Sequence, residues 1–318
     1  MSAETYSRVD HSTLSSCTSA VSTHVHLSWK LDFASKTLSG KAQHTVLLVQ
    51  STNQVCFDSS NLTITDVTID NEIAEFFMAE PHPVLGTKVT VILPENSRNH
   101  GKKVQIVFEY STSPEASAIQ WLDAAATHGK RLPYVFTQCQ AIHARSLLPC
   151  MDTPGVKATY SAEVQAPAWC TVLMSAIAEP AAPGDVKGVY RFSQLVPTPA
   201  YLIALAAGDL SSRDISPRVR VWAEPGVVEA AASDFSQTED FLKAAEDLTC
   251  PYVWKRYDVL CLPPSFPYGG MENPCLTFAT PTLLTGDKSL ADVIAHEIAH
   301  SWTGNLVTNH TWSHFWLK

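Results

Sequence analysis

The chain has 318 residues, of which 45% are hydrophobic and 17% are charged, a composition typical of globular proteins and not of disordered ones. This length favours two domains or one large domain. The 22 basic and 31 acidic side chains give a net charge of -9, which argues against nucleic acid and anionic membrane surfaces as partners. No apolar run is long enough to cross a bilayer, so membrane insertion is not expected.

The N-terminal residues and the cysteines together indicate a cytoplasmic protein. The first 23 residues are polar and lack the charged and apolar segments of a signal peptide. Eight cysteines are scattered along the chain without a Cys-x-x-Cys pair. This pattern predicts reduced thiols that serve as small buried apolar side chains.

Residues 1–210 predict an all-β domain. In residues 26–32, Leu27, Trp29 and Leu31 alternate with polar side chains, as in a strand with one buried face. Residues 103–110 repeat this alternation. Further strands are expected at residues 44–50, 61–69, 87–93, 160–166, 171–176, 189–194 and 201–207.

Residues 211–318 differ in character, because a helical pattern now follows the strands. A strand at residues 218–224 precedes a predicted helix over 233–248, in which Ser236 and Glu239 have the spacing of a capping box. The region 262–286 is rich in Pro and Gly and predicts a structured loop or an edge strand. One face of the helix predicted over 233–248 is expected to hold Phe241, Leu242, Ala245 and Leu248.

A further helix is predicted from about residue 287, with Ser289 and Asp292 in capping-box spacing. Gly304 and Asn305 are candidates for its C-terminal cap. The last residues, 311–318, predict the first turn of another helix. The helix predicted from about residue 287 is expected to carry an apolar stripe of Leu290, Ile294, Ile298 and Trp302.

The strongest chemical motif is His296-Glu297-Ile298-Ala299-His300. Positions i and i+4 of a helix share a face, so both imidazoles can bind one metal ion. Glu297 between them can accept a proton from a metal-activated water, which is general-base catalysis of attack on a carbonyl. A catalytic zinc of this kind needs a third protein ligand. His310 and His314 could supply it, although surface histidines are the simpler explanation for both.

Gly269-Gly270-Met271-Glu272-Asn273 forms a second motif. The two glycines allow a ligand to approach the backbone closely. A carboxylate at Glu272 could bind the free ammonium group of a substrate and so select exopeptidase action. A glycine turn with a solvated glutamate is the alternative.

A third segment, Gln138-Cys139-Gln140, offers amide groups that suit a peptide backbone, while a polar strand end is the simpler interpretation.

These motifs closely resemble those of the M1 family of zinc aminopeptidases. The similarity rests on residues 264–278 and 293–309, and it extends to residues 137–154 and 201–210. It implies a mainly β, saddle-like N-terminal domain over 1–210. The start of a thermolysin-like α/β zinc-peptidase domain, truncated, is implied over 211–318.

The resemblance also implies roles for individual residues. His296 and His300 would bind one zinc ion per chain, with Glu297 as general base. The substrate-binding residues would be Gln138, Cys139, Gln140, Pro267, Tyr268, Gly269, Gly270, Met271 and Glu272. The substrates would be peptides with a free N-terminus and, in the bifunctional branch of the family, a lipid epoxide of leukotriene biosynthesis.

The family pattern places the third zinc ligand, a glutamate, at the position after Lys318. The oxyanion-stabilising tyrosine and the residues for epoxide opening would also follow Lys318. Two interpretations therefore stay open. The chain is a fragment of a working zinc aminopeptidase and epoxide hydrolase, or it is a shortened, catalytically inactive product that acts at most as a binding module.

Overall fold

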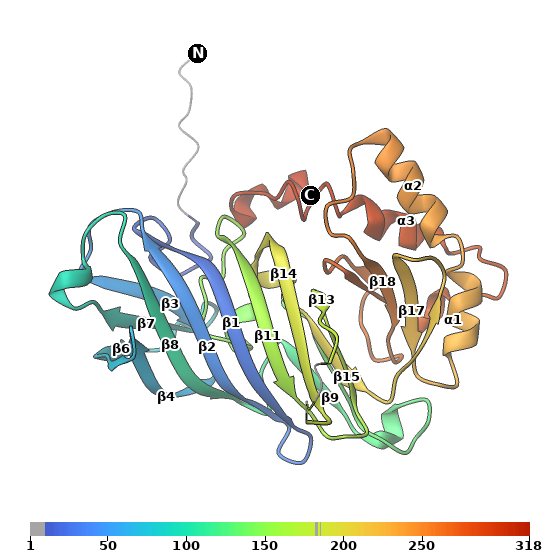
Figure 1. Ribbon diagram of the computed structural model, residues 1–318, viewed down its shortest axis with the longest axis horizontal. Coiled ribbons are helices and arrows are strands. Elements are labelled where there is room, and N and C mark those ends of the chain that lie inside the picture. Colours follow the sequence, from blue (N-terminus) through green and yellow to red (C-terminus); the bar gives the residue numbers. More distant parts are fainter. Residues whose placement is uncertain (1–9, 182–183, 185) are drawn as a thin grey trace.

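A computed structural model describes residues 10–181, 184 and 186–318 of the chain. Figure 1 shows two parts, a large assembly of twisted sheets and a smaller unit of sheet and helices beside it. The large assembly holds the strands up to residue 208, and the smaller unit begins at residue 211. Among the described residues, no helix is long and apolar enough to cross a membrane.

The main element of the first part is an eight-stranded sheet. Its centre is β1, which pairs antiparallel with β2 and parallel with β11. In order across the sheet, the strands are β13 (Ile177–Ala178), β14 (Val189–Pro199), β11 (Lys157–Gln165), β1 (Ala20–Asp32), β2 (Thr37–Leu48), β8 (Lys103–Thr112), β4 (Leu62–Ile69) and β5 (Glu72–Ile73).

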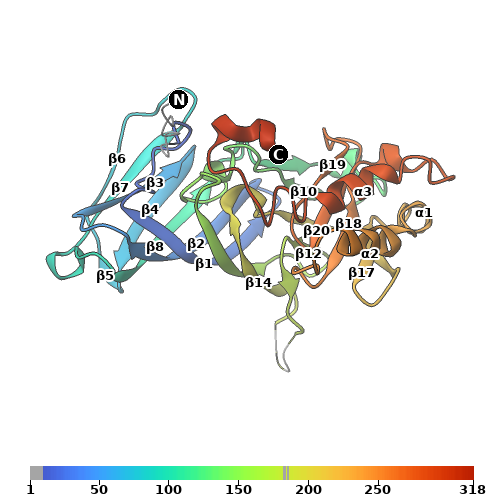
Figure 2. The same ribbon diagram turned by 90° about the horizontal axis from the view of Figure 1, so that it is seen from above.

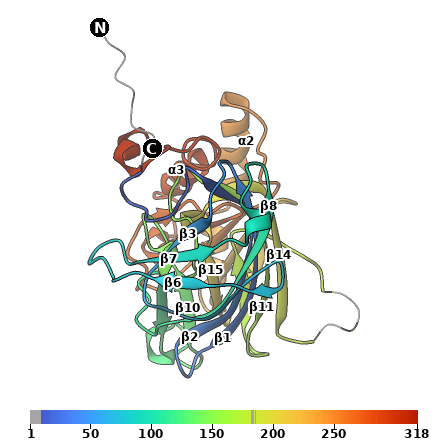
Figure 3. The ribbon, with the colours of Figure 1, turned by 90° about the vertical axis from the view of Figure 1, so that its left-hand side faces the viewer.

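Two smaller sheets complete the first part. The three-stranded one lies at the end farthest from the second part, as Figures 1 and 3 show. It consists of β3 (Gln54–Ser59), β7 (Thr87–Ile92) and β6 (Phe76–Met78). The four-stranded one consists of β12 (Thr171–Met174), β15 (Leu205–Gly208), β10 (Tyr134–Thr137) and β9 (Ile119–Leu122).

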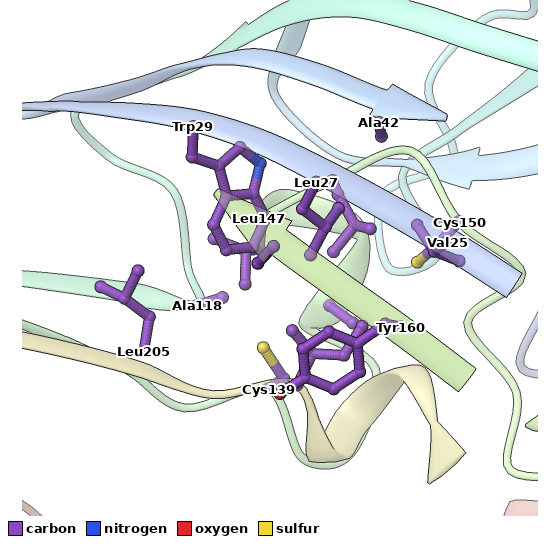
Figure 4. Close-up of a cluster of buried hydrophobic side chains, with 14 of the residues drawn as sticks. Val25, Leu27, Trp29, Ala42, Ala118, Cys139, Leu147, Cys150, Tyr160 and Leu205 are labelled. Atoms are coloured by element: carbon purple, nitrogen blue, oxygen red, sulfur yellow. The ribbon is translucent and has the colours of Figure 1, made fainter. Parts of the chain in front are cut away.

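The core of the first part lies between these sheets (Figure 4). The alternation in β1 places Leu27, Trp29 and Leu31 inside, as predicted. The buried indole of Trp29 donates a hydrogen bond to the Tyr110 hydroxyl (2.8 Å), which donates to the Leu147 carbonyl (3.1 Å). The polar atoms of both large rings are thereby satisfied inside the core.

The second part is a five-stranded sheet that carries three helices. Strands β17, β18 and β20 run parallel, and the short β19 forms the edge beyond β20. The strands are β16 (Ser211–Asp214), β17 (Val219–Ala223), β18 (Tyr257–Cys261), β20 (Leu276–Ala279) and β19 (Gly270–Met271), and the helices are α1 (Val228–Asp234), α2 (Thr238–Leu248) and α3 (Asp292–Ala299).

Short 3-10 helices occupy connections in both parts. The last of them holds the C-terminal residues that were expected to open a helix. Figure 2 shows this segment returning towards the first part, so that the C-terminus lies between the two parts. The six segments are Glu95–Ser97, Ala124–Ala126, Ala144–Ser146, Ala200–Leu202, Pro281–Leu283 and Trp312–Leu317.

No sheet of the described chain combines strands from before and after residue 210. This division supports the domain boundary that we propose there. Apolar packing nevertheless crosses it, because six side chains of the second part belong to the core cluster of the first. They are Leu260, Leu262, Phe266, Met271, Leu276 and Phe278.

Several details of the predicted elements are wrong. Residues 201–207 are strand only from Leu205, and α1 was not predicted at all. Neither capping box forms, since the residues before α2 and α3 make no side-chain cap. Helix α3 ends at Ala299, before Gly304 and Asn305. Leu248 in α2 is 84% exposed although its predicted neighbours on that face are at least partly buried.

The eight cysteines are all free thiols, and six of them are buried as predicted. The prediction of burial is wrong for Cys17, which is half-buried, and for Cys250, which is exposed. Burial raises the pKa of the Cys139 and Cys150 thiols above the usual range. A thiol whose pKa is raised carries little thiolate at neutral pH, so these side chains act as apolar core groups.

His44 in β2 is a buried histidine with complete hydrogen bonding. Its Nε2 donates to the Pro149 carbonyl (2.9 Å), so its Nδ1 accepts from the Ser22 hydroxyl (3.0 Å). The ring packs against Phe57 and Phe108. Burial lowers the pKa of His44 from 6.5 to about 4, despite the opposing effect of the Pro149 carbonyl. The folded protein therefore holds this ring neutral where the unfolded chain would protonate it.

We predict that acidification destabilises the fold through His44. As the pH falls through 6.5, the unfolded chain binds a proton that the folded protein excludes until about pH 4. The protonation of His44 in the unfolded chain should lower the free energy of unfolding by about 2 kcal/mol between pH 7 and pH 5. Urea unfolding at both pH values should show a smaller loss for His44→Gln than for the wild-type chain. An identical loss in both proteins would contradict the prediction.

Candidate metal and peptide site

Helix α3 presents the two histidines of the predicted motif on one side. His300 follows the last helical residue but keeps a right-handed helical conformation, so the i and i+4 relation holds. The two rings lie edge to face, with centroids 4.7 Å apart. Ile294 and Ile298 on the other side are buried in the core of the second part. Burial of this apolar side fixes the direction in which the histidines point.

The hydrogen bond of His300 fixes which of its ring nitrogens carries the proton. Its Nδ1 lies 2.9 Å from the main-chain oxygen of Thr303. A carbonyl oxygen only accepts, so Nδ1 donates, and in the neutral ring Nε2 is then the nitrogen with the free lone pair. Metal-binding histidines are oriented by contacts of this kind.

Glu297 is 5% exposed and has a carboxylate oxygen, Oε2, with no hydrogen-bond partner among the described residues. Burial, followed by the neighbouring charge of Glu272, raises its pKa to about 8, although Lys318 acts in the opposite direction. Its carboxylate lies directly against Gly270. A Cβ atom at that glycine would lie 2.3 Å from Oε1. Glycine is therefore required for β19 to approach α3 this closely.

Glu272 follows β19 and is 6% exposed. The Asn305 side chain donates a hydrogen bond to its main-chain carbonyl (2.7 Å). The Glu272 carboxylate forms an ion pair with Lys318. Burial raises the pKa of Glu272, but the charges of Lys318 and His300 outweigh burial, and its pKa lies below the usual value. Glu272 is thus a buried carboxylate that is held in its charged form.

Glu272, Glu297 and His300 each offer one ligand atom within 4.8 Å of the others. Two of the predicted site residues from α3 thus meet the carboxylate that follows β19. His296 is exposed and lies outside this group, beside the His300 ring. Two buried carboxylates and an imidazole with a free lone pair suit a divalent cation.

The two alternative histidine ligands lie elsewhere. The His310 backbone packs against Gly155 in the first part, and the His310 side chain is exposed. His314 lies 3.4 Å from the Thr311 hydroxyl. Neither belongs to the group of possible metal ligands. Their placement agrees with the simpler interpretation of both as ordinary loop histidines.

The predicted glutamines line a cavity of 180 Å³ between the two parts. Gln138 and Gln140 follow β10 and meet Pro267 and Tyr268 there. The Gln138 amide lies 3.1 Å from the Met271 sulfur, and its carbonyl oxygen is buried without a partner among the described residues. Cys139 differs from both neighbours, because its side chain points into the core of the first part (Figure 4).

Sequence reasoning missed three residues of this site. Asn305 was expected to cap a helix, but it holds the backbone of Glu272. Tyr201 was expected in a strand, but its hydroxyl and ring contact Lys318. Lys318 itself had no predicted role. Only Asn305 gave a signal, as a polar residue within the apolar segment that follows the histidine motif.

Comparisons with known proteins agree with these motifs. Residues 21–202 match the Peptidase M1 N-terminal domain, and residues 234–318 match the Peptidase family M1 domain. Leukotriene A-4 hydrolase from Xenopus laevis is 48% identical over 303 residues, which are 93% of this chain and 49% of that protein. Leucine aminopeptidase 2 from Yarrowia lipolytica is 46% identical over 310 residues, 97% of this chain and 47% of that protein.

Solved structures show the same relationship in three dimensions. Native yeast LTA4 hydrolase superimposes with a TM-score of 0.92 at 39% identity, over 100% of this chain and 49% of that one. The chain thus spans about half the length of the relatives that it matches. The first family model alone covers more than half of the chain. The chain therefore belongs to the M1 peptidase family.

Proposed function

We propose that this chain carries the zinc-binding and amino-terminus-binding half of an aminopeptidase, which removes N-terminal residues from peptides. The observation that carries the proposal is the meeting of Glu272, Glu297 and His300 within 4.8 Å. Glu272 suits recognition of an ammonium group, Glu297 suits proton transfer, and His300 suits metal binding. These are the functions that hydrolysis at a free amino terminus requires.

Zinc would be held by His296 and His300, with a third ligand expected after Lys318. The fixed tautomer of His300 and the unpartnered oxygen of Glu297 fit a cation at this place. A bound zinc ion would lower the pKa of a water molecule towards 7 and polarise the scissile carbonyl.

Glu297 would act as the general base. It takes a proton from the attacking water and can return that proton to the leaving amine. Gly270 leaves room for its carboxylate beside β19, and no hydrogen bond from a described residue occupies its Oε2. The base is therefore positioned by packing and free to bind water.

Glu272 would bind the α-ammonium group of the peptide. Its carboxylate is buried and charged, and a cationic partner stabilises a buried carboxylate more than an exposed one. Recognition of the amino terminus at this point would place the first peptide bond next to Glu297. An ammonium site next to the base thus restricts cleavage to the N-terminal residue.

The peptide backbone would lie along β19 and the adjoining cavity. Within the described chain, β19 pairs only with β20, so its outer edge is free to pair with an extended peptide. Gln138 and Gln140 offer amide groups to the same segment, next to Pro267 and Tyr268. For Cys139, only its main chain is in a position to contribute.

The relatives support this assignment and add a second candidate activity. One related structure is yeast LTA4 hydrolase in complex with bestatin, and another relative is named leucine aminopeptidase 2. Similarity to proteins named leukotriene A-4 hydrolase favours opening of a lipid epoxide as the additional reaction. The eight free thiols favour a cytoplasmic location. A binding module without catalysis is the alternative function for these 318 residues.

We predict that Glu297→Gln lowers peptidase activity by about 100- to 10,000-fold, the usual contribution of a general base. The amide keeps the shape of the side chain but cannot accept the proton. Zinc content should stay equal to that of the wild-type chain. Turnover of an aminoacyl fluorogenic substrate and metal analysis of the same samples provide the measurements. Undiminished turnover would refute the role of Glu297, and absence of turnover in the zinc-loaded wild-type chain would favour the binding module.

Glu272→Gln should weaken binding of a peptide with a free amino terminus by about 10- to 100-fold, the value of a hydrogen bond to a charged group. The acetylated form of the same peptide lacks the ammonium group and should bind equally to both proteins. Calorimetric titration with the two peptides measures this difference. An unchanged preference for the free amino terminus would show that another group recognises it.

The two glycines before Met271 provide a matched pair of variants. In Gly270→Ala, the new methyl group collides with the Glu297 carboxylate, so we expect a loss of about 1 to 3 kcal/mol in unfolding free energy. Displacement of the base by about 1 Å should also cost about 100-fold in turnover. In Gly269→Ala, the nearest atom is 3.9 Å from the new methyl group, and both quantities should stay close to wild type. Equal effects in both variants would contradict the packing argument.

A further inference from the structure

The side chain of Lys318 enters the candidate site and is 3% exposed. Its ammonium group forms an ion pair with the Glu272 carboxylate. The same group donates to the Tyr201 hydroxyl (3.3 Å) and lies 4.6 Å from the centroid of the Tyr201 ring. These contacts give the lysine an anionic, a polar and an aromatic partner, which together compensate for its burial.

Packing of the C-terminal segment brings the lysine to this position. The Trp312 ring packs against the Tyr201 ring, with centroids 5.0 Å apart, and the Lys318 amide donates to the Phe315 carbonyl (2.9 Å). Gly304 leaves space for the side chain, since a Cβ atom there would lie 3.2 Å from Lys318 Cε. Figure 2 shows that the C-terminus lies between the two parts of the molecule, where the site is.

The chemistry of this contact is that of an amino terminus. A lysine side chain and a peptide α-amino group both end in an ammonium group with three donors. Glu272 has one carboxylate, and Lys318 already neutralises it in a buried setting. A peptide amino terminus must therefore displace Lys318, or share the carboxylate with a second positive charge. Two ammonium groups that share one carboxylate lie close together, and like charges repel strongly where water is excluded.

We propose that Lys318 is a resident ammonium group that competes with the amino terminus of a peptide for Glu272. The inference rests on the proposed function, because it assumes that Glu272 recognises amino termini. Lys318 would thus set the affinity of the site for free peptides.

Two variants of Lys318 test the competition. Lys318→Gln removes the charge at similar length, and Lys318→Arg keeps a charge. If Lys318 occupies Glu272 in about nine of ten molecules, its removal should tighten binding of a free tripeptide about tenfold. The arginine variant should bind the tripeptide like wild type, and the acetylated tripeptide should not distinguish the three proteins. Calorimetric titration of the three proteins at equal, measured zinc content gives these affinities.

Reactivity of the lysine amines tests the contact without any peptide. In trace acetylation followed by mass spectrometry, Lys318 should react more slowly than Lys243, whose side chain is 62% exposed. In Glu272→Gln, the reactivity of Lys318 should rise while that of Lys243 stays constant. Fast acetylation of Lys318 in the wild-type chain would overturn the proposal at its first step.

The remaining outcomes separate the inference from the proposed function. Equal or weaker binding of the free tripeptide by Lys318→Gln would overturn the competition while leaving amino-terminus recognition intact. A protected Lys318 with no tripeptide binding by either protein would overturn the proposed function, and the competition with it. Tighter binding by Lys318→Gln together with protection of Lys318 supports the proposal.

Discussion

The burial of two carboxylates beside each other is the constraint on which the candidate site depends. Glu272 and Glu297 are both nearly inaccessible, and each charge raises the cost of the other. Such a pair persists only where the surrounding structure holds it and supplies positive charge. Gly270 gives the Glu297 carboxylate its space, and Asn305 fixes the backbone of Glu272. Strand β19 and helix α3 therefore pack together around buried negative charge, for which neighbouring groups must supply positive charge.

The first part of the chain contributes directly to this arrangement. The Lys157 ammonium group, in β11, donates to the carbonyls of Asn305 (3.1 Å) and Leu306 (3.0 Å). Asn305 in turn holds Glu272, so a contact path runs from the large sheet to the candidate ammonium site. A second link joins the parts, because the Glu224 carboxylate accepts from the amides of His128 (2.9 Å) and Gly129 (3.3 Å). The β domain thus acts as one wall of the site as well as a support.

The sequence allowed correct prediction wherever the determining contacts are local. Alternation within β1 and the spacing of His296 and His300 depend on residues a few positions apart, and both predictions hold. Prediction of the caps failed because the expected capping groups have other partners. Glu239 pairs with the distant Arg218, and the Ser289 amide donates to Asp287 in a local turn. The Cys139 side chain and Lys318 likewise take positions that only the packing of separate sheets determines.

Electrostatics gives a physical reason for the proposed binding of a metal and an ammonium group at one place. The charged carboxylate of Glu272 pairs with Lys318, and the negative charge of Glu272 helps to raise the pKa of the neighbouring Glu297. The imidazoles of His296 and His300 add ligand atoms for the metal. A cation bound beside the pair would favour the charged form of Glu297 in a region with little water. In the proposed arrangement, this negative charge would therefore favour zinc at His296 and His300 and an amino terminus at Glu272. The proposed preference for a free amino terminus thus depends on the same negative charge that suits the metal.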